Sequence, residues 1–395
     1  MRSASATVVC QSQMEASVVD RLSSGRWLKQ QVPRYSPQTD GKKIRVVDLF
    51  CGAGGMTLGV IECLLHYKLN PTIEFATDQD SDAIAVYNSN FHNIAGDIMQ
   101  DDITRHVSGV LGRKEPTKSE KELLTKMASV EVLLAGPPCQ GHSDLNNHTR
   151  RLDERNLLYL RAVRFAKLVS PKVILIENVR TVTLDRNGVV QTGRRRLEEL
   201  GYQVQESVVN AASLGLPQLR KRHLLLATKK RIPELKFDLP TRLPPLSAFI
   251  GDLLNEEPVS SDDLFRTASK LSRENLARAE FLLANDLFDL PNEHRPSCHR
   301  DKEHSYVSMY GRLSWEKPAQ TITSGFGSPG QGRYIHPVFP RVITPHEAAR
   351  IQGFPDYFTF DRVRTRSKLQ TVIGNAVPPV LSAAVLEHAI RNGAL

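Results

Sequence analysis

The sequence is poor in cysteine, and this excludes two common kinds of structural site. Its 395 residues include five cysteines, an odd number, and no two of them are spaced as a CxxC pair. A disulfide framework and a structural zinc site are therefore not expected. Long apolar runs are also absent, since none approaches the roughly 20 residues that span a bilayer. We expect a protein without a metal and without a membrane segment, located in the cytoplasm.

Acidic residues are outnumbered by basic ones. The chain has 52 Lys and Arg against 43 Asp and Glu, a formal net charge of +9. Two stretches, 186–196 and 218–231, carry several basic residues and no acidic one. A polyanion would suit such stretches, but a basic balance also keeps many proteins soluble without any such partner. Charge alone therefore leaves nucleic acid open as a partner.

The chain from residue 44 onwards alternates short β-rich runs with helical stretches. The predicted strands are 44–49, 72–77, 131–135, 172–177, 203–209 and 222–228. The predicted helices between them are 55–67, 80–90, 118–127, 156–169 and 190–200. This alternation predicts an α/β fold with a doubly wound, Rossmann-like parallel sheet covered by helices.

The alternation stops after Arg231. Residues 232–340 are rich in Pro, Gly and polar residues, which predicts a second, smaller and irregular domain. Helical patterns at 344–352 and 376–391 predict that the C-terminus returns to the first domain. The expected parts are an N-terminal extension, 1–43, in which Met14 to Leu28 form a short amphipathic helix, a main domain, 44–231 and 341–395, and the second domain, 232–340.

A glycine-rich turn follows the first predicted strand. The strand ends in Phe50, and Cys51-Gly52-Ala53-Gly54-Gly55 comes next, so the backbone there can approach a ligand closely. Asp78 closes the second strand, where its carboxylate can accept hydrogen bonds from a ribose, and Asp97 could accept one from an adenine amino group. This pattern suits either a dinucleotide or S-adenosylmethionine.

A cysteine and a glutamate end two further strands. Cys139 follows Pro137 and Pro138, whose restricted backbones would hold a thiol in one place, as a nucleophile requires. Glu177 ends the next strand, which should lie beside the cysteine strand. Burial would raise the pKa of Glu177 so that it could donate a proton near neutral pH. We therefore expect a thiol and a carboxyl group in one cleft.

Six sequence blocks together carry a family resemblance. They are Asp48–Gly55, Pro137–Gln140, Glu177–Val179, Gln218–Arg222, Ala348–Pro355 and Gly374–Pro378. In this order they resemble the cytosine-C5 DNA methyltransferases of the bacterial type, which use S-adenosylmethionine. His346 stands where the family commonly has Arg.

The resemblance implies a role for each catalytic residue. Cys139 would attack C6 of cytosine, while Glu177 would hydrogen-bond N3 and the exocyclic amine. Arg222, and with it Arg220, would hold the base O2 and the catalytic loop, and their charge would favour the thiolate. The base that removes the C5 proton has no assignment.

The resemblance also implies the ligand contacts. The expected S-adenosylmethionine contacts are Phe50, Gly52, Ala53, Gly54, Gly55, Asp78, Gln79, Asp97, Ile98, Pro138 and Asn375. Double-stranded DNA would be contacted by Ser143, Asn146, Arg150 and Arg151 in a loop that closes over the target, and by Arg295, Arg312 and Arg333 in a target-recognition domain, 232–340. The target base would be flipped out of the duplex.

Two other functions compete with DNA methylation. The same chemistry on tRNA occurs in a smaller branch of the superfamily, although the long recognition segment favours DNA. A catalytically silent DNA-binding module is the other, and intact Cys139, Glu177 and Arg222 weigh against it. A dinucleotide oxidoreductase explains neither the cysteine block nor the glutamate block. We expect a monomer associated with the nucleoid, for which a genetically linked restriction endonuclease is a candidate partner.

Overall fold

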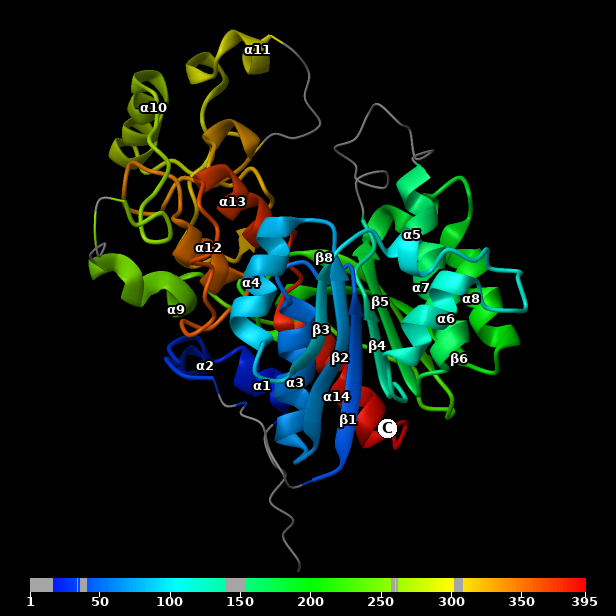
Figure 1. Ribbon diagram of the computed structural model, residues 1–395. Coiled ribbons are helices and arrows are strands. Elements are labelled where there is room, and N and C mark those ends of the chain that lie inside the picture. The colour runs from blue at the N-terminus through cyan, green and yellow to red at the C-terminus, as the bar shows by residue number, and fades with distance from the viewer. Residues whose placement is uncertain are drawn as a thin grey trace, which may run out of the picture.

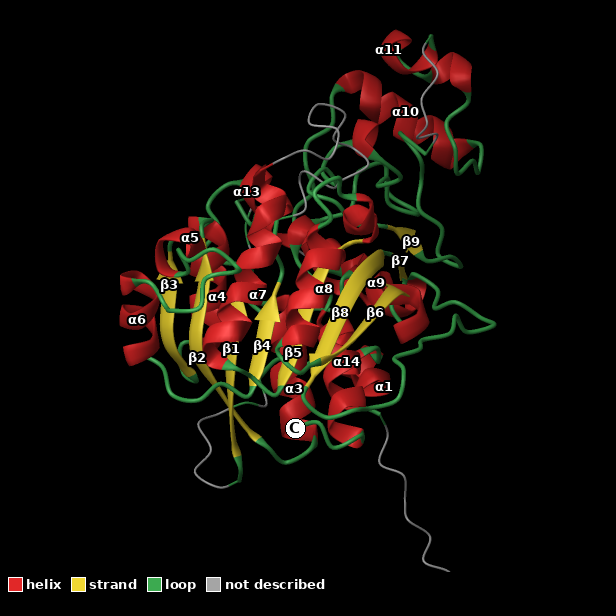
Figure 2. Cartoon of the chain, turned by 90° about the vertical axis from the view of Figure 1, so that its right-hand side faces the viewer, coloured by secondary structure: helices red, strands yellow, loops and turns green. Residues whose placement is uncertain are grey.

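Seven strands form one sheet at the centre of the molecule (Figures 1 and 2). The computed structural model describes residues 17–33, 35, 41–138, 154–256, 260, 262–301 and 308–395. The strands are β1 Lys43–Leu49, β2 Asn70–Asp78, β3 Ala95–Gln100, β4 Val132–Ala135, β5 Val173–Val179, β6 Gln203–Asn210 and β8 Lys221–Thr228. Their order across the sheet is β3-β2-β1-β4-β5-β8-β6.

The sheet is parallel from β3 to β5, but β8 runs antiparallel to both of its neighbours. The expectation of an entirely parallel sheet is therefore wrong for this strand. The chain between β6 and β8 holds only a 3-10 turn, Ala211–Leu214, and the short strand β7, Gln218–Leu219. This link is too short for the helical crossover that a parallel strand requires.

Helices cover both faces of the sheet, as a doubly wound fold predicts. The main helices are α3 Gly55–His66, α4 Ser81–Phe91, α6 Lys118–Thr125, α7 Leu158–Val169, α8 Val189–Glu199, α12 Pro345–Ile351, α13 Arg366–Asn375 and α14 Pro379–Arg391. Successive strand residues enter different hydrophobic clusters: Val46 belongs to the cluster that includes α3 and α14, and Val47 to the one that includes α7 and α8. The predicted α/β architecture is confirmed.

The elements of this domain that the sequence did not predict include the strand β3 and the helix α13. β3 is an edge strand with no fully buried residue, so it lacks the apolar run that marks an inner strand. Backbone pairing with β2 holds it in place.

The run Arg366–Arg391, which contains α13 and α14, is long and apolar enough to cross a membrane, but 78% of its apolar window is buried inside the fold. A core helix has that property.

The N-terminal segment packs into the main hydrophobic cluster, although it was expected to be an extension. Its helices are α1 Val18–Leu22 and α2 Gly25–Leu28. Trp27 is 2% exposed, and its Nε1 donates a hydrogen bond to the Gly353 carbonyl oxygen at 3.0 Å. The Ser17 hydroxyl donates one to the Glu387 carboxylate on α14 at 2.6 Å.

The second domain is irregular, as its composition predicts. In Figure 1 it lies above and to one side of the sheet. Its elements are α9 Ser247–Ile250, α10 Arg273–Ala284, α11 Ser297–Arg300 and β9 Ala319–Gln320, which pairs with β7. A small cluster that includes Leu282, Leu290 and Ile335 forms its own core.

A charged network joins the second domain to the returning C-terminal segment. His346 Nδ1 lies 2.8 Å from the Glu256 carboxylate, and its Nε2 lies 2.9 Å from that of Asp356. A neutral imidazole has one N–H group, so only the protonated ring can donate to both carboxylates.

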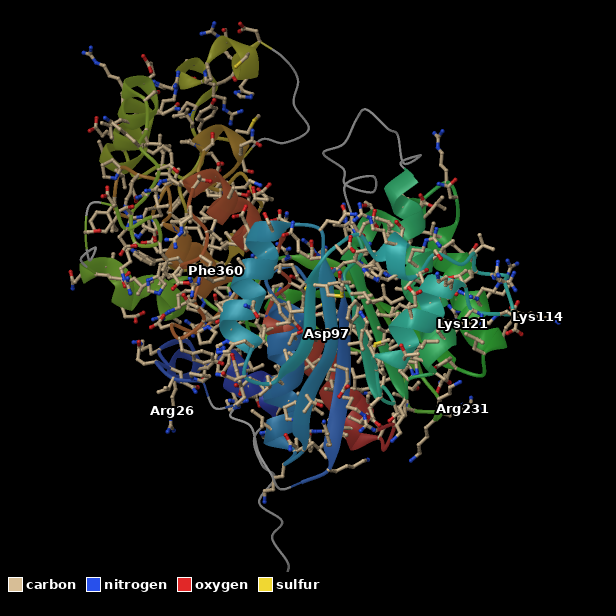
Figure 3. All side chains as sticks on the ribbon, viewed as in Figure 1. Arg26, Asp97, Lys114, Lys121, Arg231 and Phe360 are labelled. Carbon is tan, nitrogen blue, oxygen red and sulfur yellow. The ribbon has the colours of Figure 1, made fainter. Side chains whose placement is uncertain are left out.

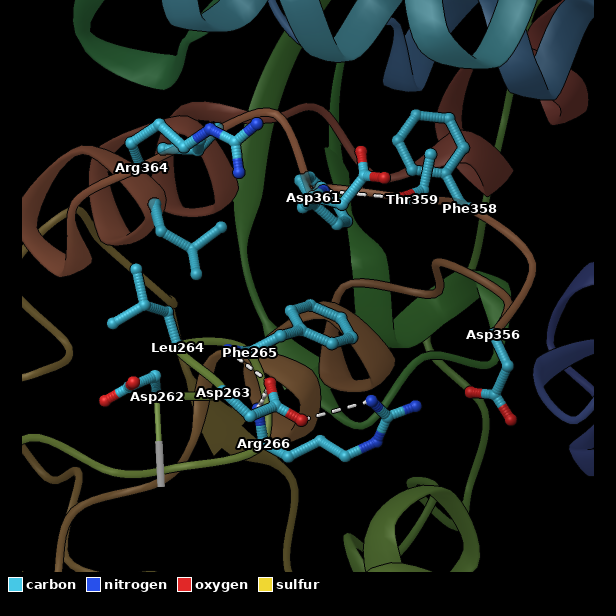
Figure 4. Close-up of a pocket in the computed structure, with 13 residues that line it drawn as sticks. Asp262, Asp263, Leu264, Phe265, Arg266, Asp356, Phe358, Thr359, Asp361 and Arg364 are labelled. Atoms are coloured by element: carbon cyan, nitrogen blue, oxygen red, sulfur yellow. Dashed lines mark hydrogen bonds and ion pairs between the residues drawn. The ribbon is translucent and has the colours of Figure 1, made fainter. Parts of the chain in front are cut away.

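A cavity of about 500 Å³ opens beside this junction, and Phe265, Arg266 and Asp356 are among the residues that line it (Figure 4).

This network makes the stability of the fold depend on pH. Burial opposes the charge on His346, but the hydrogen bonds to Asp356 and Glu256 prevail and raise the pKa of His346. Its contribution to stability is therefore complete below the unfolded pKa of about 6.5 and is lost as pH rises through the folded value. We expect His346→Gln to lower the free energy of unfolding by about 2 kcal/mol at pH 6 and by clearly less at pH 9.

Urea unfolding at both pH values tests this expectation. His92→Gln is the matched control, because His92 is exposed and contacts only its own helix. An equal loss of stability at the two pH values in His346→Gln would contradict the protonated state of the ring.

Candidate active site

The carboxyl ends of β1, β4 and β5 meet the amino end of β8 at one edge of the sheet. The register pairs Leu49 with Ala135, Ala135 with Ile176, and Val179 with Arg222. The glycine-rich turn, the Pro137-Pro138 segment and Glu177 therefore lie on neighbouring strand ends. The structure brings these sequence blocks together, as expected from a parallel arrangement of β1, β4 and β5.

The glycine-rich turn has a backbone that favours glycine. Gly52 and Gly54 have φ angles of 53° and 90°, in the left-handed region. A Cβ atom on Gly54 would collide with Phe91, and one on Gly55 with the Val377 carbonyl oxygen. A Cβ on Gly52 would meet no atom of the described residues within 4 Å, so this glycine has open space beside it in the described part of the chain. A ligand can approach the backbone there.

Asp78 holds the turn from the end of β2. Its Oδ2 accepts a hydrogen bond from the Gly52 N–H at 2.9 Å, and its Oδ1 accepts one from the Asp80 N–H at 2.9 Å. Burial raises the pKa of Asp78, while these backbone hydrogen bonds lower it in part. A carboxylate oxygen has a second lone pair, so Asp78 can still accept from a ribose hydroxyl.

Glu177 and Arg222 form an ion pair at the same edge. Glu177 Oε1 lies 2.9 Å from Arg222 Nε, and the two side chains are only 9% and 13% exposed. None of the described residues gives this oxygen a hydrogen bond of good geometry, so the contact is an ion pair. The neighbouring Asn178 donates from Nδ2 to the Pro137 carbonyl oxygen at 3.1 Å. Asn178 thereby ties the proline segment to β5, a role that the sequence analysis did not assign.

Arg220 makes contacts that the sequence analysis did not assign to it. Its guanidinium is buried and donates to three backbone carbonyl oxygens, those of Ile322 at 2.8 Å, Gly374 at 3.2 Å and Ala376 at 3.1 Å. Arg220 therefore joins the second domain to the block that connects α13 and α14. Arg220 reaches these carbonyl groups because it lies between β7 and β8, next to the pairing of β7 with β9.

The expected adenine contacts, Asp97 and Ile98, lie away from the carboxyl edge. Asp97 pairs with Phe75 in the middle of β3, whereas Gln100 pairs with Asp78 at the end of the strand. Figure 3 labels Asp97 at mid-height of the sheet. The error arose because β3 was not predicted, so the end of the strand could not be located.

A second acid-isoleucine pair, Asp102 and Ile103, follows the end of β3. The Asp102 carboxylate accepts a hydrogen bond from the Thr104 N–H at 2.8 Å and interacts with the side chain of Gln79, which follows Asp78. Burial acts to raise the pKa of Asp102, but the hydrogen bonds from Thr104 and Gln79 prevail and lower it. The repeated Asp-Ile pair in the sequence was the signal that could have identified these residues.

The remaining cofactor candidates lie around the turn. Phe50 has a φ angle of 58° and Ala53 is buried. Pro138 is half-buried after β4, and Asn375 is exposed at the end of α13. The Asn375 block reaches the turn through Val377, whose carbonyl oxygen contacts Gly55.

Several candidates fall outside the described residues. These are Cys139, Ser143, Asn146, Arg150 and Arg151. Pro138, the residue that precedes Cys139, is described, so the structure shows which strand end leads to the cysteine. The described part of the chain contains no group of three or more His, Cys, Asp or Glu that could hold a metal ion.

The three arginines expected to contact DNA in the second domain are held by that domain. Arg312 is 7% exposed, and its guanidinium lies 2.5 Å from Asp286 and donates to the Pro337 carbonyl oxygen. Arg333 pairs with Asp289 at 2.6 Å. Arg295 donates to the Leu290 carbonyl oxygen at 3.1 Å. Arg312 is therefore structural, because its burial leaves no surface for a phosphate or a base.

Comparison with known proteins agrees with this arrangement. The family model for the C-5 cytosine-specific DNA methylases matches residues 44–391. The chain belongs to this family. The methyltransferase is 42% identical to the Type II methyltransferase M1.BsuMI of Bacillus subtilis, over 97% of this chain and 89% of that protein. It is 31% identical to the Type II methylase M.HgiDII of Herpetosiphon aurantiacus, over 88% of this chain and 95% of that protein.

Solved structures share the fold of the methyltransferase. The Entamoeba histolytica methyltransferase EhMeth gives a TM-score of 0.59 at 16% identity, covering 89% of this chain and 98% of that one. A variant of Spodoptera frugiperda DNMT2 gives 0.59 at 18% identity, covering 88% and 99%. The protein is a DNA (cytosine-5-)-methyltransferase with a Rossmann-like sheet.

The position of Arg220 predicts a stability defect. Arg220→Met would leave three buried carbonyl oxygens without a donor, so we expect the free energy of unfolding to fall by about 3 kcal/mol. Chemical denaturation measures this. Arg195→Met on α8 is the control, because Arg195 is exposed and should change stability by less than about 0.5 kcal/mol. Equal stability of the two variants would show that the hydrogen bonds of Arg220 do not stabilise the contact between the second domain and the segment that joins α13 and α14.

Proposed function

We propose that the protein transfers a methyl group from S-adenosylmethionine to C5 of a flipped-out cytosine in duplex DNA, through a covalent bond between Cys139 and C6. The Glu177–Arg222 ion pair carries this proposal. It lies at the edge where the Pro137-Pro138 segment leads to Cys139 and where the glycine-rich turn begins two strands away. A carboxyl group and a guanidinium meet there, next to the strand end that the cysteine block follows in the sequence.

The chemistry explains why these groups are needed together. C5 of cytosine is a poor nucleophile, and addition of a thiolate to C6 converts the ring into an enamine that can attack a methyl group. Glu177 would hold a proton at N3 during this addition. After methylation, a base removes the C5 proton, the electron pair forms the C5–C6 double bond, and the C6–sulfur bond breaks to release Cys139.

The ion pair suits Glu177 to this role. Glu177 is 7% exposed, so little water competes for its carboxyl group. Arg222 pairs with the Glu177 side chain before the base enters, while a base in the site would offer N3 and the exocyclic amine as new partners. Arg222 would then be free to turn toward the base O2 and the thiolate.

The turn fits the cofactor. S-adenosylmethionine supplies an electrophilic methyl group when it is bound. The open space at Gly52 admits close backbone approach, and Asp78 remains able to accept from a ribose. Asp102 and Ile103 take the place of Asp97 and Ile98 in our proposal, and Asn375 would complete the site from the returning C-terminal segment.

Duplex DNA is the substrate that the domain organisation favours. Residues 232–340 would form the target-recognition domain, and the contacts of Arg220 and His346 join this irregular part of the chain to the sheet domain. A duplex substrate requires base flipping, since a thiol cannot reach a stacked base, at a cost of a few kcal/mol. Two relatives are named Type II methyltransferase and Type II methylase, and on this ground a restriction endonuclease for the same DNA sequence is the candidate partner. Bisulfite sequencing of DNA from cells that express the protein would reveal the methylated sequence.

Two substitutions test the chemistry. We expect Cys139→Ser to abolish methyl transfer and to keep DNA binding, because it removes only the nucleophile. We expect Glu177→Gln to lower the rate at least about 100-fold, because its amide cannot deliver a proton to N3. Transfer of labelled methyl groups to duplex DNA and to tRNA, compared side by side, gives the rate and the substrate class.

A 5-fluorocytosine duplex tests the covalent bond itself. The fluorine blocks loss of the C5 substituent, so the wild type should remain attached to the DNA and Cys139→Ser should not. Turnover by Cys139→Ser, or absence of a trapped complex with active wild type, would refute the covalent route. Faster methylation of tRNA than of DNA would favour the tRNA alternative.

The two Asp-Ile pairs give a matched test of cofactor placement. We expect Asp102→Asn to weaken S-adenosylmethionine binding about tenfold, because it removes a charged acceptor while an amide can still cap the following helix. Asp97→Asn, in the middle of β3, should leave binding unchanged. Calorimetry of cofactor binding distinguishes them, and the reverse ranking would restore Asp97 to the site.

A further inference from the structure

Asp48 is a buried carboxyl group directly beneath the glycine-rich turn. It lies near the end of β1 and is 1% exposed. The Thr57 hydroxyl on α3 donates a hydrogen bond to its Oδ2 at 2.6 Å. Its Oδ1 is also buried and has no hydrogen-bond partner among the described residues. A buried carboxylate with one oxygen unsatisfied is costly, so the site favours either a proton on Asp48 or an added positive charge.

The surroundings of Asp48 are tied to the turn. The Thr57 hydroxyl lies 2.9 Å from the Tyr87 hydroxyl on α4. Tyr87 and Phe91 fill the space that a side chain on Gly54 would need. Tyr35 stacks on Phe91 at 5.9 Å between ring centroids. The network is therefore continuous with the backbone that would receive the cofactor.

The titratable groups that interact with Asp48 in the described part of the chain bring no positive charge. They are Asp78 on β2, Cys51 in the turn and Tyr87 on α4. Burial raises the pKa of Asp48 to about 7, the hydrogen bond from Thr57 lowers it in part, and the charge of Asp78 raises it. Near neutral pH, Asp48 is therefore divided between its protonated and its ionised form.

We propose that Asp48 is the counter-charge for a cationic cofactor and loses its proton when S-adenosylmethionine binds in the glycine-rich turn. This inference rests on the proposed function. The demethylated product has a neutral thioether in place of the sulfonium, so it favours the ionised form of Asp48 less. Asp48 takes back a proton when the product replaces the substrate. The preference for S-adenosylmethionine over S-adenosylhomocysteine therefore increases with pH, and Asp48 is a positioning residue that favours exchange of the spent cofactor.

Calorimetry in two buffers with different heats of ionisation measures the protons released on binding. At pH 7 we expect S-adenosylmethionine to release roughly half a proton more than S-adenosylhomocysteine, because about half of the Asp48 side chains are protonated beforehand. The affinity ratio of the two ligands should increase about tenfold from pH 6 to pH 8. In Asp48→Asn, a neutral isostere, both the extra proton release and the pH dependence should disappear.

Two further variants keep the test decisive. Thr57→Val removes a hydrogen bond that favours the anion, so we expect the midpoint of the pH dependence to move to higher pH. Tyr159→Phe is the matched control for changes in the core, because Tyr159 is buried and its hydroxyl has no partner among the described residues. It should leave both measurements unchanged.

The outcomes separate this inference from the proposed function. Proton release and pH dependence that persist in Asp48→Asn would overturn the role of Asp48. If Asp48→Asn does not fold, an unmoved midpoint in Thr57→Val would overturn it as well. Failure of the wild type to bind S-adenosylmethionine at all would instead refute the cofactor assignment in the proposed function.

Discussion

The register of β1, β4, β5 and β8 is the constraint on which the active edge depends. These strands are buried on both faces over most of their length, so a slip of one residue would turn every side chain to the opposite face. With this register, the glycine-rich turn, the proline segment and Glu177 share one edge. The antiparallel direction of β8 then places Arg222 beside Glu177.

Two arginines in one sequence block have different roles for the same reason. Arg222 lies on β8 and faces Glu177, whereas Arg220 lies in the link between β7 and β8 and reaches the carbonyl oxygens of Ile322 and Gly374. One contributes charge to the site and the other holds the second domain against it. Within one block of five residues, Arg222 therefore belongs to the candidate site and Arg220 to the contact with the second domain.

The C-terminal segment completes the catalytic domain. α14 packs against α3, and the block before it contacts Gly55 and Arg220. The N-terminal segment binds α14 through Ser17 and the Gly353 carbonyl group after α12 through Trp27. His346 of the C-terminal segment adds a charged contact to Glu256 in the second domain. The described parts of both ends of the chain thus pack around the sheet domain, although neither part contains a strand of the sheet.

The sequence alone predicted the α/β class and six of the seven strands of the central sheet, because apolar runs are local. Rare local motifs likewise marked the glycine-rich turn, Cys139, Glu177 and Arg222 as candidates. The sequence did not determine the direction of β8, the end of β3 or the burial of Arg220 and Arg312. Those features depend on pairing between segments far apart in the chain. The pairing of β3 with β2 places Asp102 rather than Asp97 near the carboxyl edge, and the packing around β1 leaves one Asp48 oxygen without a partner among the described residues. Both features depend on which strands and helices become neighbours, which no local pattern reveals.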